Sequence, residues 1–259
     1  MKVQDGVWWD EMWNPVYGCT KISPACDNCY AERLGKRFHG HFNVTIREDV
    51  LEKPLRWRRP RVVFVCGMSD LFHESVPDEF IERVFEVAFQ RVNQHTFIFL
   101  TKRAARMATF VESIAGHIDL SRAWLGVTVE NQEQADLRIP HLIECPAQNR
   151  FISVEPMLGP IGLPSSILQR IKLVICGGES GPLARPVNPF WVSSLQHQCH
   201  VEGTSFFFKQ WGEWLPDCQN EKKGFIGNGN ARVGKQQAGR KLDGVEYLNL
   251  PWGNKGGAS

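Results

Sequence analysis

Six short, nearly continuous apolar runs recur along the chain, and they constrain its fold more than any other feature. Each run has the length of one strand and is rich in β-branched or aromatic residues, which is typical of a strand buried on both faces. The intervals are long enough for crossover helices, and residues 78–92, which follow Pro77, carry apolar side chains at helical spacing. This alternation predicts a parallel sheet with right-handed crossovers. The runs are residues 62–65, 97–100, 124–129, 151–154, 173–176 and 206–208.

The predicted fold class is α/β, a complete or partial parallel (β/α) barrel related to the TIM barrel. The six runs and one further strand inferred before Cys19 suit a barrel, and 259 residues is a common length for one. A doubly wound sheet is the alternative fold. We expect residues 1–216 to form the barrel. Residues 217–259 are rich in Gly, Asn, Lys and Gln, and we expect a C-terminal extension that is either solvated or a flexible basic arm for phosphates.

Charge and hydropathy exclude some classes of protein. The formal net charge is +2, so the overall charge does not indicate a nucleic-acid partner, although it is compatible with a local basic surface. No stretch approaches the roughly 20 apolar residues that cross a bilayer, and the amino-terminal residues lack the apolar run of a signal peptide. We therefore expect a cytoplasmic protein with no membrane partner, in which the eight cysteines are thiols or ligands rather than disulfides.

Polar or glycine residues end every apolar run. Because the carboxyl ends of parallel strands meet on one face of a barrel, where active sites lie, we expect these residues to line one mouth. The candidates for catalysis, by proton transfer or by binding a substrate phosphate, are Asp70, Lys102, Glu155 and Lys209. The candidates for cofactor binding are Ser69, Thr101, Glu130, Gly177, Gly178 and Glu179.

The sequence Gly177-Gly178-Glu179 closes one of the apolar strands. Glycines let a ligand approach the backbone closely, and their amides can receive a carboxylate or a phosphate; a plain turn between strand and loop is the alternative. Glu179 could accept a hydrogen bond from an amine or a ribose hydroxyl. Several acids on one face need cations beside them. The cations available for this are Lys102, Arg103, Arg185 and Lys209.

Three cysteines near the amino terminus, Cys19, Cys26 and Cys29, have the spacing C-x6-C-x2-C. Thiolates are soft ligands that suit zinc or iron–sulfur clusters. A structural zinc site takes four protein ligands, so zinc would need a fourth, for which His39 and His41 are the candidates. Three cysteines leave one iron of a four-iron cluster free to hold a small molecule. We therefore expect a 4Fe-4S cluster at this loop, with zinc as the alternative.

Several motifs between about residue 8 and residue 252 together resemble a known protein family. They are residues 13–19 (WNPVYGC), 26–31 (CDNCYA), 69–73 (SDLFH), 100–103 (LTKR), 153–156 (SVEP), 177–181 (GGESG) and 207–212 (FFKQWG). The set resembles the phage "gp thirty-seven / gp sixty-eight" family, which carries a three-cysteine motif and has no settled activity. This resemblance implies a protein of a bacterial host or a phage-infected cell.

More distantly, residues 14–30, Asp70 and the Thr101-Lys102 pair look like the radical S-adenosylmethionine (SAM) enzymes related to spore photoproduct lyase. In that superfamily three cysteines hold a 4Fe-4S cluster at the mouth of a partial barrel. The open iron chelates SAM, whose cleavage yields a 5′-deoxyadenosyl radical that abstracts hydrogen. The resemblance implies that the three cysteines of the loop are the cluster ligands. It does not extend to Glu179, because the glycine-glycine-glutamate element of that superfamily follows the second strand.

The functional hypothesis is therefore a radical SAM-like iron–sulfur enzyme that acts on nucleic acid or a nucleotide and takes its electron from a reductant protein. A non-enzymatic phage protein that binds nucleic acid and holds zinc or an iron–sulfur cluster is the alternative, and a barrel that has lost its chemistry is a third. Residues 55–61 (LRWRRPR) place four arginines around Trp57. They could grip phosphates and stack a base, or form a solvated connection.

Overall fold

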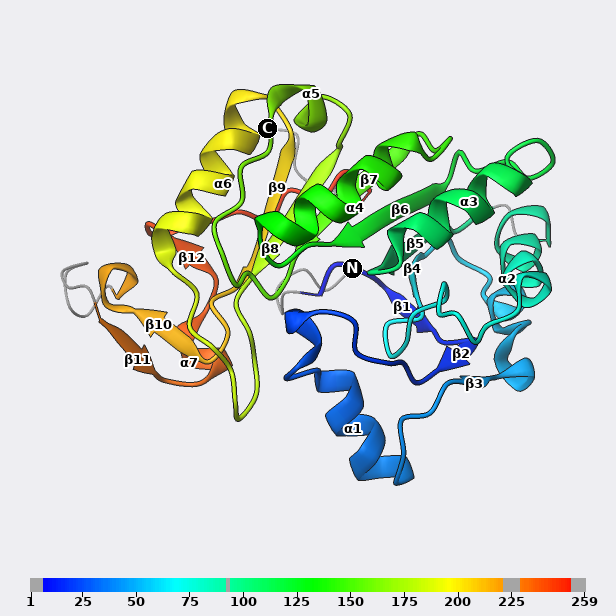
Figure 1. Ribbon diagram of the computed structural model, residues 1–259, viewed down its shortest axis with the longest axis horizontal. Coiled ribbons are helices and arrows are strands. Elements are labelled where there is room, and N and C mark those ends of the chain that lie inside the picture. Colours follow the sequence, from blue (N-terminus) through cyan, green and yellow to red (C-terminus); the bar gives the residue numbers. More distant parts are fainter. Residues whose placement is uncertain (1–6, 92–93, 221–228, 253–259) are drawn as a thin grey trace.

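The computed structural model describes residues 7–91, 94–220 and 229–252 (Figure 1). A seven-stranded sheet runs in the order β1-β4-β5-β6-β7-β8-β9, and all neighbouring strands are parallel. The prediction of a parallel sheet is confirmed, because the six apolar runs form β4 to β9 and the inferred strand is β1. The strands are β1 (Glu11–Trp13), β4 (Val62–Val65), β5 (Thr96–Thr101), β6 (Ala123–Thr128), β7 (Asn149–Val154), β8 (Leu173–Gly177) and β9 (Ser205–Gln210).

The sheet curves into a half-barrel, with β1 at one edge and β9 at the other (Figure 1). Its strand order follows the sequence from edge to edge, whereas a doubly wound sheet reverses its order at a switch point. The structure is thus the partial form of the predicted barrel, and the doubly wound alternative is wrong. All the carboxyl ends of the strands lie on the same edge of the sheet, as the prediction of a shared mouth requires.

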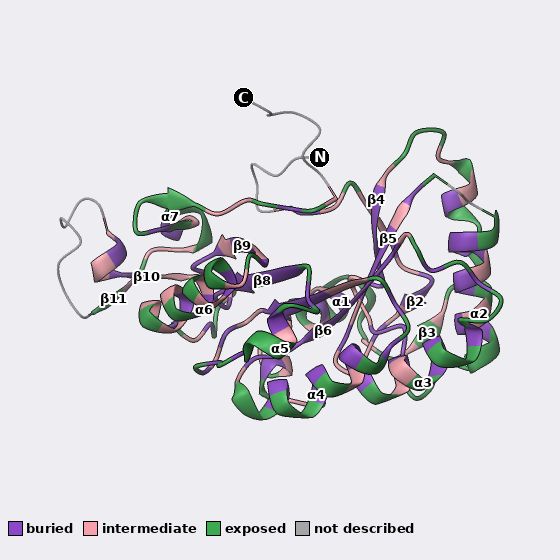
Figure 2. Cartoon of the chain, turned by 90° about the horizontal axis from the view of Figure 1, so that it is seen from above, coloured by how far each residue is buried: buried purple, intermediate pink, exposed green. Residues whose placement is uncertain are grey.

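Crossover helices cover one face of the sheet (Figure 2). Asn131 and Asn188 cap two of them, since their side chains accept hydrogen bonds from the backbone N–H groups of Gln134 and Phe190. The predicted helix from residue 78 is α-helical to Phe85 and continues as the π-helical turn η5 (Glu86–Arg91). The crossover helices are α2 (Asp78–Phe85), α3 (Ala104–Ile114), α4 (Gln132–Glu144), α5 (Ser165–Leu168) and α6 (Pro189–Val201).

Aromatic side chains from both ends of the described chain cover the other face of the sheet. The Trp8 ring packs 4.9 Å from that of Phe64, and the Trp252 ring packs 4.4 Å from that of Trp124. Trp252 Nε1 also donates a hydrogen bond to Trp8 O at 3.1 Å. The buried ring of Trp8 contributes about 2 kcal/mol from burial alone. The two faces of the sheet therefore have separate apolar clusters, one beneath the helices and one beneath the terminal segments.

The described part of the C-terminal extension packs against β9. Phe207 forms an antiparallel bridge with Leu248, and Trp211 Nε1 donates to Lys241 O at 2.8 Å. Residues 221–228 and 253–259 of the predicted extension lie outside the described residues. The remaining elements are β2 (Val16–Tyr17) paired with β3 (Thr45–Ile46), β10 (Trp214–Pro216) with β11 (Asn230–Arg232), β12 (Lys241–Leu242) with β13 (Val245–Glu246), α1 (Tyr30–His39), α7 (Lys235–Ala238), η2 (Pro24–Cys26), η3 (Glu48–Val50), η4 (Lys53–Arg56) and η6 (Asp217–Gln219).

Across these described ranges, no helix has both the length and the apolar character needed to cross a membrane.

Candidate functional site

The cysteine loop, residues 18–29, lies between β2 and α1 and is joined to the segment that follows β4. Gly18 forms a parallel bridge with Ser69, whose Oγ donates a hydrogen bond to Val16 O at 2.6 Å. Gly18 has a φ of +80°, and a Cβ at this position would lie 2.2 Å from Asn43 O, so a side chain does not fit. The predicted cofactor residue Ser69 therefore fastens the start of the loop to the carboxyl edge of the sheet.

The three thiols of the cysteine loop are free and partly exposed. Burial and the Asp70 carboxylate raise the pKa of the Cys19 thiol to about 11, against the opposing charge of Arg103. Cys26 is close enough to Cys19 to act on its charge, and the Cys29 N–H donates to Cys26 O at 3.3 Å. The described residues contain no group of three His, Cys, Asp or Glu side chains placed around a single metal ion.

His39 and His41, the candidates for a fourth zinc ligand, lie against the Tyr17 ring. Their ring centroids are 5.0 Å and 6.2 Å from that of Tyr17. The Tyr17 hydroxyl donates to His41 O at 3.3 Å. These contacts hold the end of α1 against β2.

Asp70 is buried, and its carboxylate accepts hydrogen bonds from four residues. Thr101 Oγ1 donates to its two oxygens at 2.7 and 2.9 Å, and the backbone N–H groups of Phe72 and Lys102 donate at 3.0 and 3.2 Å. Arg103 Nη1 adds an ion pair at 3.1 Å. Asp70 and Thr101 thus join the end of β5 to the segment after β4, and the Asp70 carboxylate is fully used within the protein.

Arg103 connects these strand ends to the cysteine loop. Its Nη1 lies 3.5 Å from Cys19 Sγ, and its Nη2 donates to Thr20 Oγ1 at 2.9 Å. Its Nε donates to both oxygens of Glu74 at 2.9 Å. We call such a set of contacts between a strand-end side chain and the cysteine loop an anchor, and Arg103 provides the first. It places a buried positive charge next to the Cys19 sulfur.

His73 contributes to the same anchor through Thr20. Its Nε2 lies 2.8 Å from Thr20 Oγ1, and its Nδ1 accepts a hydrogen bond from the Ser75 N–H at 3.0 Å. Burial and the Arg103 charge lower its pKa, which favours the neutral ring. The His73 side chain therefore bonds to Thr20 and Ser75.

Glu130, which follows β6, provides the second anchor and is fully buried. Its Oε2 accepts from Arg138 of α4 at 3.0 Å, and its Oε1 accepts from the Ala25 N–H of the loop at 3.2 Å. Arg138 also donates to Thr128 O at 2.7 Å. The carboxylate thus holds the middle of the cysteine loop to the sheet and to a crossover helix.

Glu179, which follows β8, provides the third anchor. It accepts from Asn28 Nδ2 at 3.0 Å and from three N–H groups of Arg185 at 2.6 to 2.9 Å. Arg185 Nη2 also donates to Pro24 O at 2.9 Å. Burial alone would raise the pKa of Glu179, but the hydrogen bonds from Arg185 and Asn28 outweigh it and lower the pKa.

Glu155 and Lys209 lie at the ends of β7 and β9. Lys209 Nζ is 2.7 Å from Glu155 Oε1, and both side chains are largely buried. Desolvation and the nearby charges of Glu155 and Cys29 raise the pKa of Tyr30, whose hydroxyl donates to Gly67 O at 2.6 Å. The Glu155 carboxylate is therefore close enough to the Cys29 end of the loop for both groups to act on the Tyr30 phenol.

The charges of Glu155 and Lys209 also act on Lys235 of α7. Desolvation and the Lys209 charge lower its pKa, while Glu155 and Glu213 oppose this shift. The C-terminal extension thus contributes a cation to the region between β7 and β9.

The remaining predicted residues have backbone roles. Lys102 is half-buried, and its N–H donates to Asp70. The Gly178 N–H donates to Gln210 O at 2.8 Å, and a Cβ on Gly178 would lie 1.9 Å from Trp211 O. A Cβ on Gly177 would make an ordinary contact with Glu155 at 3.4 Å. The absence of a side chain at Gly178 thus lets two loops touch backbone to backbone, whereas the predicted approach of a ligand to these glycines stays a prediction.

Three anchor residues were not singled out from the sequence: Thr20, Asn28 and Arg138. Thr20 and Asn28 each stand next to a cysteine, and polar residues in that position are a usable signal. Arg138 comes eight residues after Glu130, on the helix that follows the same strand. Because a crossover helix packs back along the strand before it, the sequence could have suggested this pair. The arginine-rich segment 55–61 lies at the opposite edge of the sheet, where Arg61 pairs with Glu11 at 2.9 Å.

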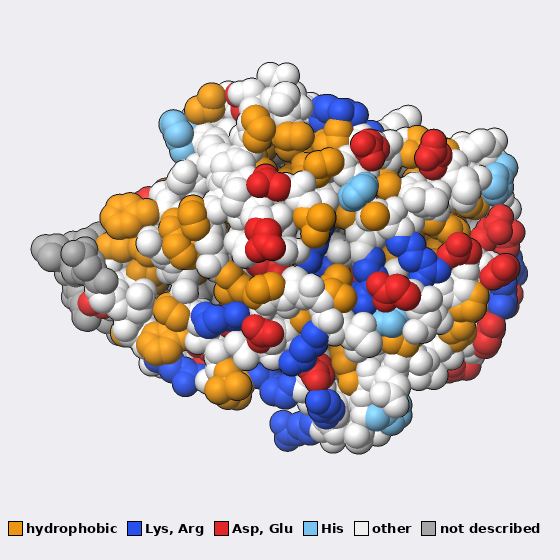
Figure 3. Space-filling view, in the orientation of Figure 1, with side chains coloured by type: hydrophobic (Ala, Val, Ile, Leu, Met, Phe, Trp, Pro, Cys, Tyr) orange, Lys and Arg blue, Asp and Glu red, His pale blue; other side chains and the backbone are white. Residues whose placement is uncertain are grey.

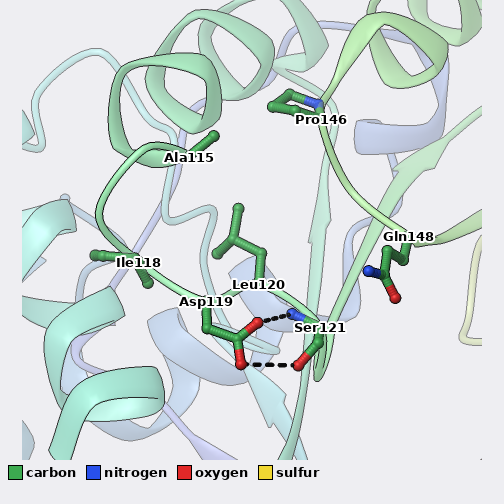
Figure 4. A pocket seen from close by; sticks show the side chains of 7 residues that line it. All are labelled: Ala115, Ile118, Asp119, Leu120, Ser121, Pro146 and Gln148. Atoms are coloured by element: carbon green, nitrogen blue, oxygen red, sulfur yellow. Dashed lines mark hydrogen bonds between the residues drawn. The ribbon is translucent and has the colours of Figure 1, made fainter.

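A small hollow also lies at that opposite edge, between the ends of α3 and α4 (Figure 4). It has a volume of about 180 Å³ and is lined by Asp119, Ser121 and Gln148 among others. The Asp119 carboxylate already accepts hydrogen bonds from the Ser121 N–H and hydroxyl at 2.9 and 3.0 Å. The hollow therefore offers no free acid, and the cysteine loop is the better candidate site.

Residues 5–251 match the model of a protein family described as "Protein of unknown function (DUF5131)". The chain belongs to this family. No curated protein and no solved structure matches it. The DUF5131 match covers every anchor of the cysteine loop, so the arrangement described above falls within the family's own sequence.

Proposed function

We propose that this DUF5131 protein is a radical SAM-like iron–sulfur enzyme whose three loop cysteines hold a 4Fe-4S cluster. The observation that carries the proposal is the position of the loop. Side chains that follow β4, β5, β6 and β8 all bind it, at the sheet edge where barrel enzymes hold their active sites. Burying charged side chains costs free energy unless they are paired. Here the buried charged side chains hold the loop that carries the three thiols.

The donor set of the loop suits such a cluster. Its three sulfurs are soft ligands, and a four-iron cluster bound by three cysteines keeps one iron open. When bound, the cluster would supply an iron that chelates SAM and the electron that cleaves it. The ligands must lose their protons on binding, and Arg103 stands beside the Cys19 sulfur to stabilise its thiolate.

The chain's own side chains would orient the substrate. We assign Glu155 and Lys209 to substrate binding and proton transfer, because this largely buried ion pair lies at the strand ends and the Glu155 charge acts on Tyr30, which follows Cys29. Lys235 adds a second cation beside it. Asp70, Thr101, Glu130 and Glu179 have their polar atoms engaged in the loop anchors, so we assign them to positioning the cysteines.

The substrate class that we propose is nucleic acid or a nucleotide. The helix α1 begins at the cysteine loop and exposes Arg33, Lys36 and Arg37. Lys36 pairs with Glu32, whereas Arg33 and Arg37 make no ion pair within the described ranges. Lys and Arg side chains gather at the lower edge of the molecule in Figure 3, where α1 lies. Such cations attract phosphates and would draw them toward the thiols.

Anaerobic reconstitution with iron and sulfide tests the proposal. We expect the wild-type protein to bind about four irons, to turn brown, and to cleave SAM when a reductant is added. Cys19→Ala, Cys26→Ala and Cys29→Ala should each abolish the chromophore, and Cys218→Ala should leave it intact as the matched control. Iron binding that survives any one of the three loop substitutions would contradict the ligand assignment.

The exposed cations of α1 also favour the alternative, a non-enzymatic protein that binds nucleic acid and holds its metal structurally. In that case the protein would take up metal and bind nucleic acid with an affinity that falls steeply with salt, yet would leave SAM intact. Replacing Arg33 and Arg37 by Gln should weaken nucleic-acid binding in either case. SAM cleavage therefore separates the two functions.

A further inference from the structure

Arg103 uses every one of its N–H groups. A guanidinium has five N–H donors in one plane, and here they reach Glu74 from Nε, Asp70 and Cys19 from Nη1, and the hydroxyl and carbonyl oxygens of Thr20 from Nη2. The side chain is almost completely buried. Its orientation is therefore fixed by a complete set of partners, and the Cys19 sulfur is one of them.

The neighbours of Arg103 leave part of its positive charge available to that sulfur. Glu74 is exposed, so water screens its charge. Asp70 is buried, but it also accepts from the Thr101 hydroxyl and from two backbone N–H groups, which share its negative charge. The Cys19 sulfur accepts from Arg103 at 3.5 Å.

Thr20 holds the outer side of the guanidinium. Because His73 Nδ1 accepts from the Ser75 N–H, the neutral ring carries its proton on Nε2 and donates it to Thr20 Oγ1. Arg103 Nη2 donates to the same oxygen, so both lone pairs of the hydroxyl are used. The pair formed by Thr20 and His73 therefore fixes Arg103 from the side that Asp70 does not reach.

We infer that Arg103 is a positioning residue that raises the reduction potential of the cluster by donating a charge-assisted hydrogen bond to the Cys19 sulfur. The inference rests on the proposed function. Reduction adds one negative charge to the cluster, and hydrogen bonds to its sulfurs stabilise the reduced state. Lysine cannot replace the arginine, since a point-like ammonium cannot reach the sulfur, both carboxylates and Thr20 at once.

The test is an anaerobic redox titration of the reconstituted protein, followed by electron paramagnetic resonance of the reduced cluster. Arg103→Gln should lower the equilibrium constant for reduction at least about tenfold, which is about 59 mV for a one-electron couple. Thr20→Val, which keeps the charge but frees one side of the guanidinium, should shift the potential the same way by less. The control is Arg150→Gln, since Arg150 is a half-buried arginine at the opposite edge of the sheet.

The double variant Asp70→Asn with Arg103→Gln separates the hydrogen bond from the ion pair. It removes both charges together, so a potential that stays below wild type measures the lost N–H···S bond. If Arg103→Gln does not assemble a cluster, the Thr20→Val titration decides the matter alone.

Two results remain distinct. A wild-type protein that takes up no cluster overturns the proposed function. If the cluster assembles and the potentials of Arg103→Gln and of the double variant both equal the wild-type potential, the role of Arg103 is overturned and the proposed function stands. Where those variants do not load, a Thr20→Val potential equal to wild type gives the same result.

Discussion

Arg138 donates a hydrogen bond to Glu130 Oε2 at 3.0 Å in the interior, and Oε1 of the same carboxylate accepts from the Ala25 N–H of the cysteine loop. Both side chains of this ion pair are almost completely buried. A buried pair of this kind adds little net stability, but removing one partner leaves the other charged and unpaired. The loop position and the folded state therefore depend on the same contact.

Replacing Arg138 by Met should destabilise the protein by about 3–5 kcal/mol, because Glu130 would stay buried without a cation. The double variant Glu130→Gln with Arg138→Met should recover part of that loss, since no unpaired charge remains. Urea unfolding followed by tryptophan fluorescence measures both changes. If Arg138→Met lowers the free energy of unfolding by no more than the loss of an exposed ion pair would, Glu130 is not buried without a cation in that variant.

The Glu179 anchor predicts a stability that depends on pH. The pKa of Glu179 is lowered in the folded protein, so its contribution is complete above the unfolded value of about 4.3 and is lost as the pH falls through the folded value. Glu179→Gln should therefore be less stable than wild type between about pH 5 and pH 7. The difference should shrink in stronger acid.

Thermal unfolding from pH 7 to pH 3 checks this dependence. Glu48→Gln is the matched control, because the pKa of Glu48 is also lowered by an arginine, Arg83, but the pair is exposed and screened. We expect its profile to follow wild type. A Glu179→Gln profile parallel to wild type at every pH would rule out Glu179 as a titrating anchor.

The fold could be predicted from the sequence because burial of a parallel strand on both faces leaves a clear signal. The runs at β4 to β9 are continuous and apolar, whereas β1 has three residues and is predicted only as a further strand before Cys19. Closure could not be predicted, because it depends on whether the edge strands β1 and β9 meet. The aromatic cover on the inner face was also hidden, since Trp8 and Trp252 are 244 residues apart in the chain.

The candidate site was predictable in position and less so in role. Strand-end residues such as Asp70, Glu130 and Glu179 do gather at one edge, as parallel strands require. Their partners come from residues far away in sequence, such as Ala25 for Glu130 and Asn28 for Glu179. Spacing alone cannot distinguish an acid that faces a ligand from one that holds a loop, because the two differ only in which donors surround them.

The contact between Gly178 and Trp211 predicts a contrast between two neighbouring glycines. A Cβ on Gly178 would lie 1.9 Å from Trp211 O, and the backbone on both sides is held by hydrogen bonds. Gly178→Ala should therefore cost about 1–3 kcal/mol or more through forced backbone movement. Gly177→Ala is the control, since its Cβ would meet Glu155 at an ordinary 3.4 Å. Urea unfolding that shows equal losses for the two would refute the backbone contact.

The thiol of Cys19 should react slowly in the metal-free folded protein. Burial and Asp70 raise its pKa to about 11, so only about one molecule in a thousand carries the reactive thiolate at pH 8. In the unfolded chain a cysteine has a pKa of about 8.5, and alkylation by iodoacetamide should be at least about tenfold faster there.

Peptide mapping by mass spectrometry gives the rate at each cysteine, and the half-exposed Cys218 reports on accessibility in the folded state. Because Arg103 opposes the shift, Arg103→Gln should slow Cys19 further wherever that variant remains folded. A Cys19 that reacts as fast in the folded protein as in urea would show that neither the Asp70 charge nor burial acts on its sulfur.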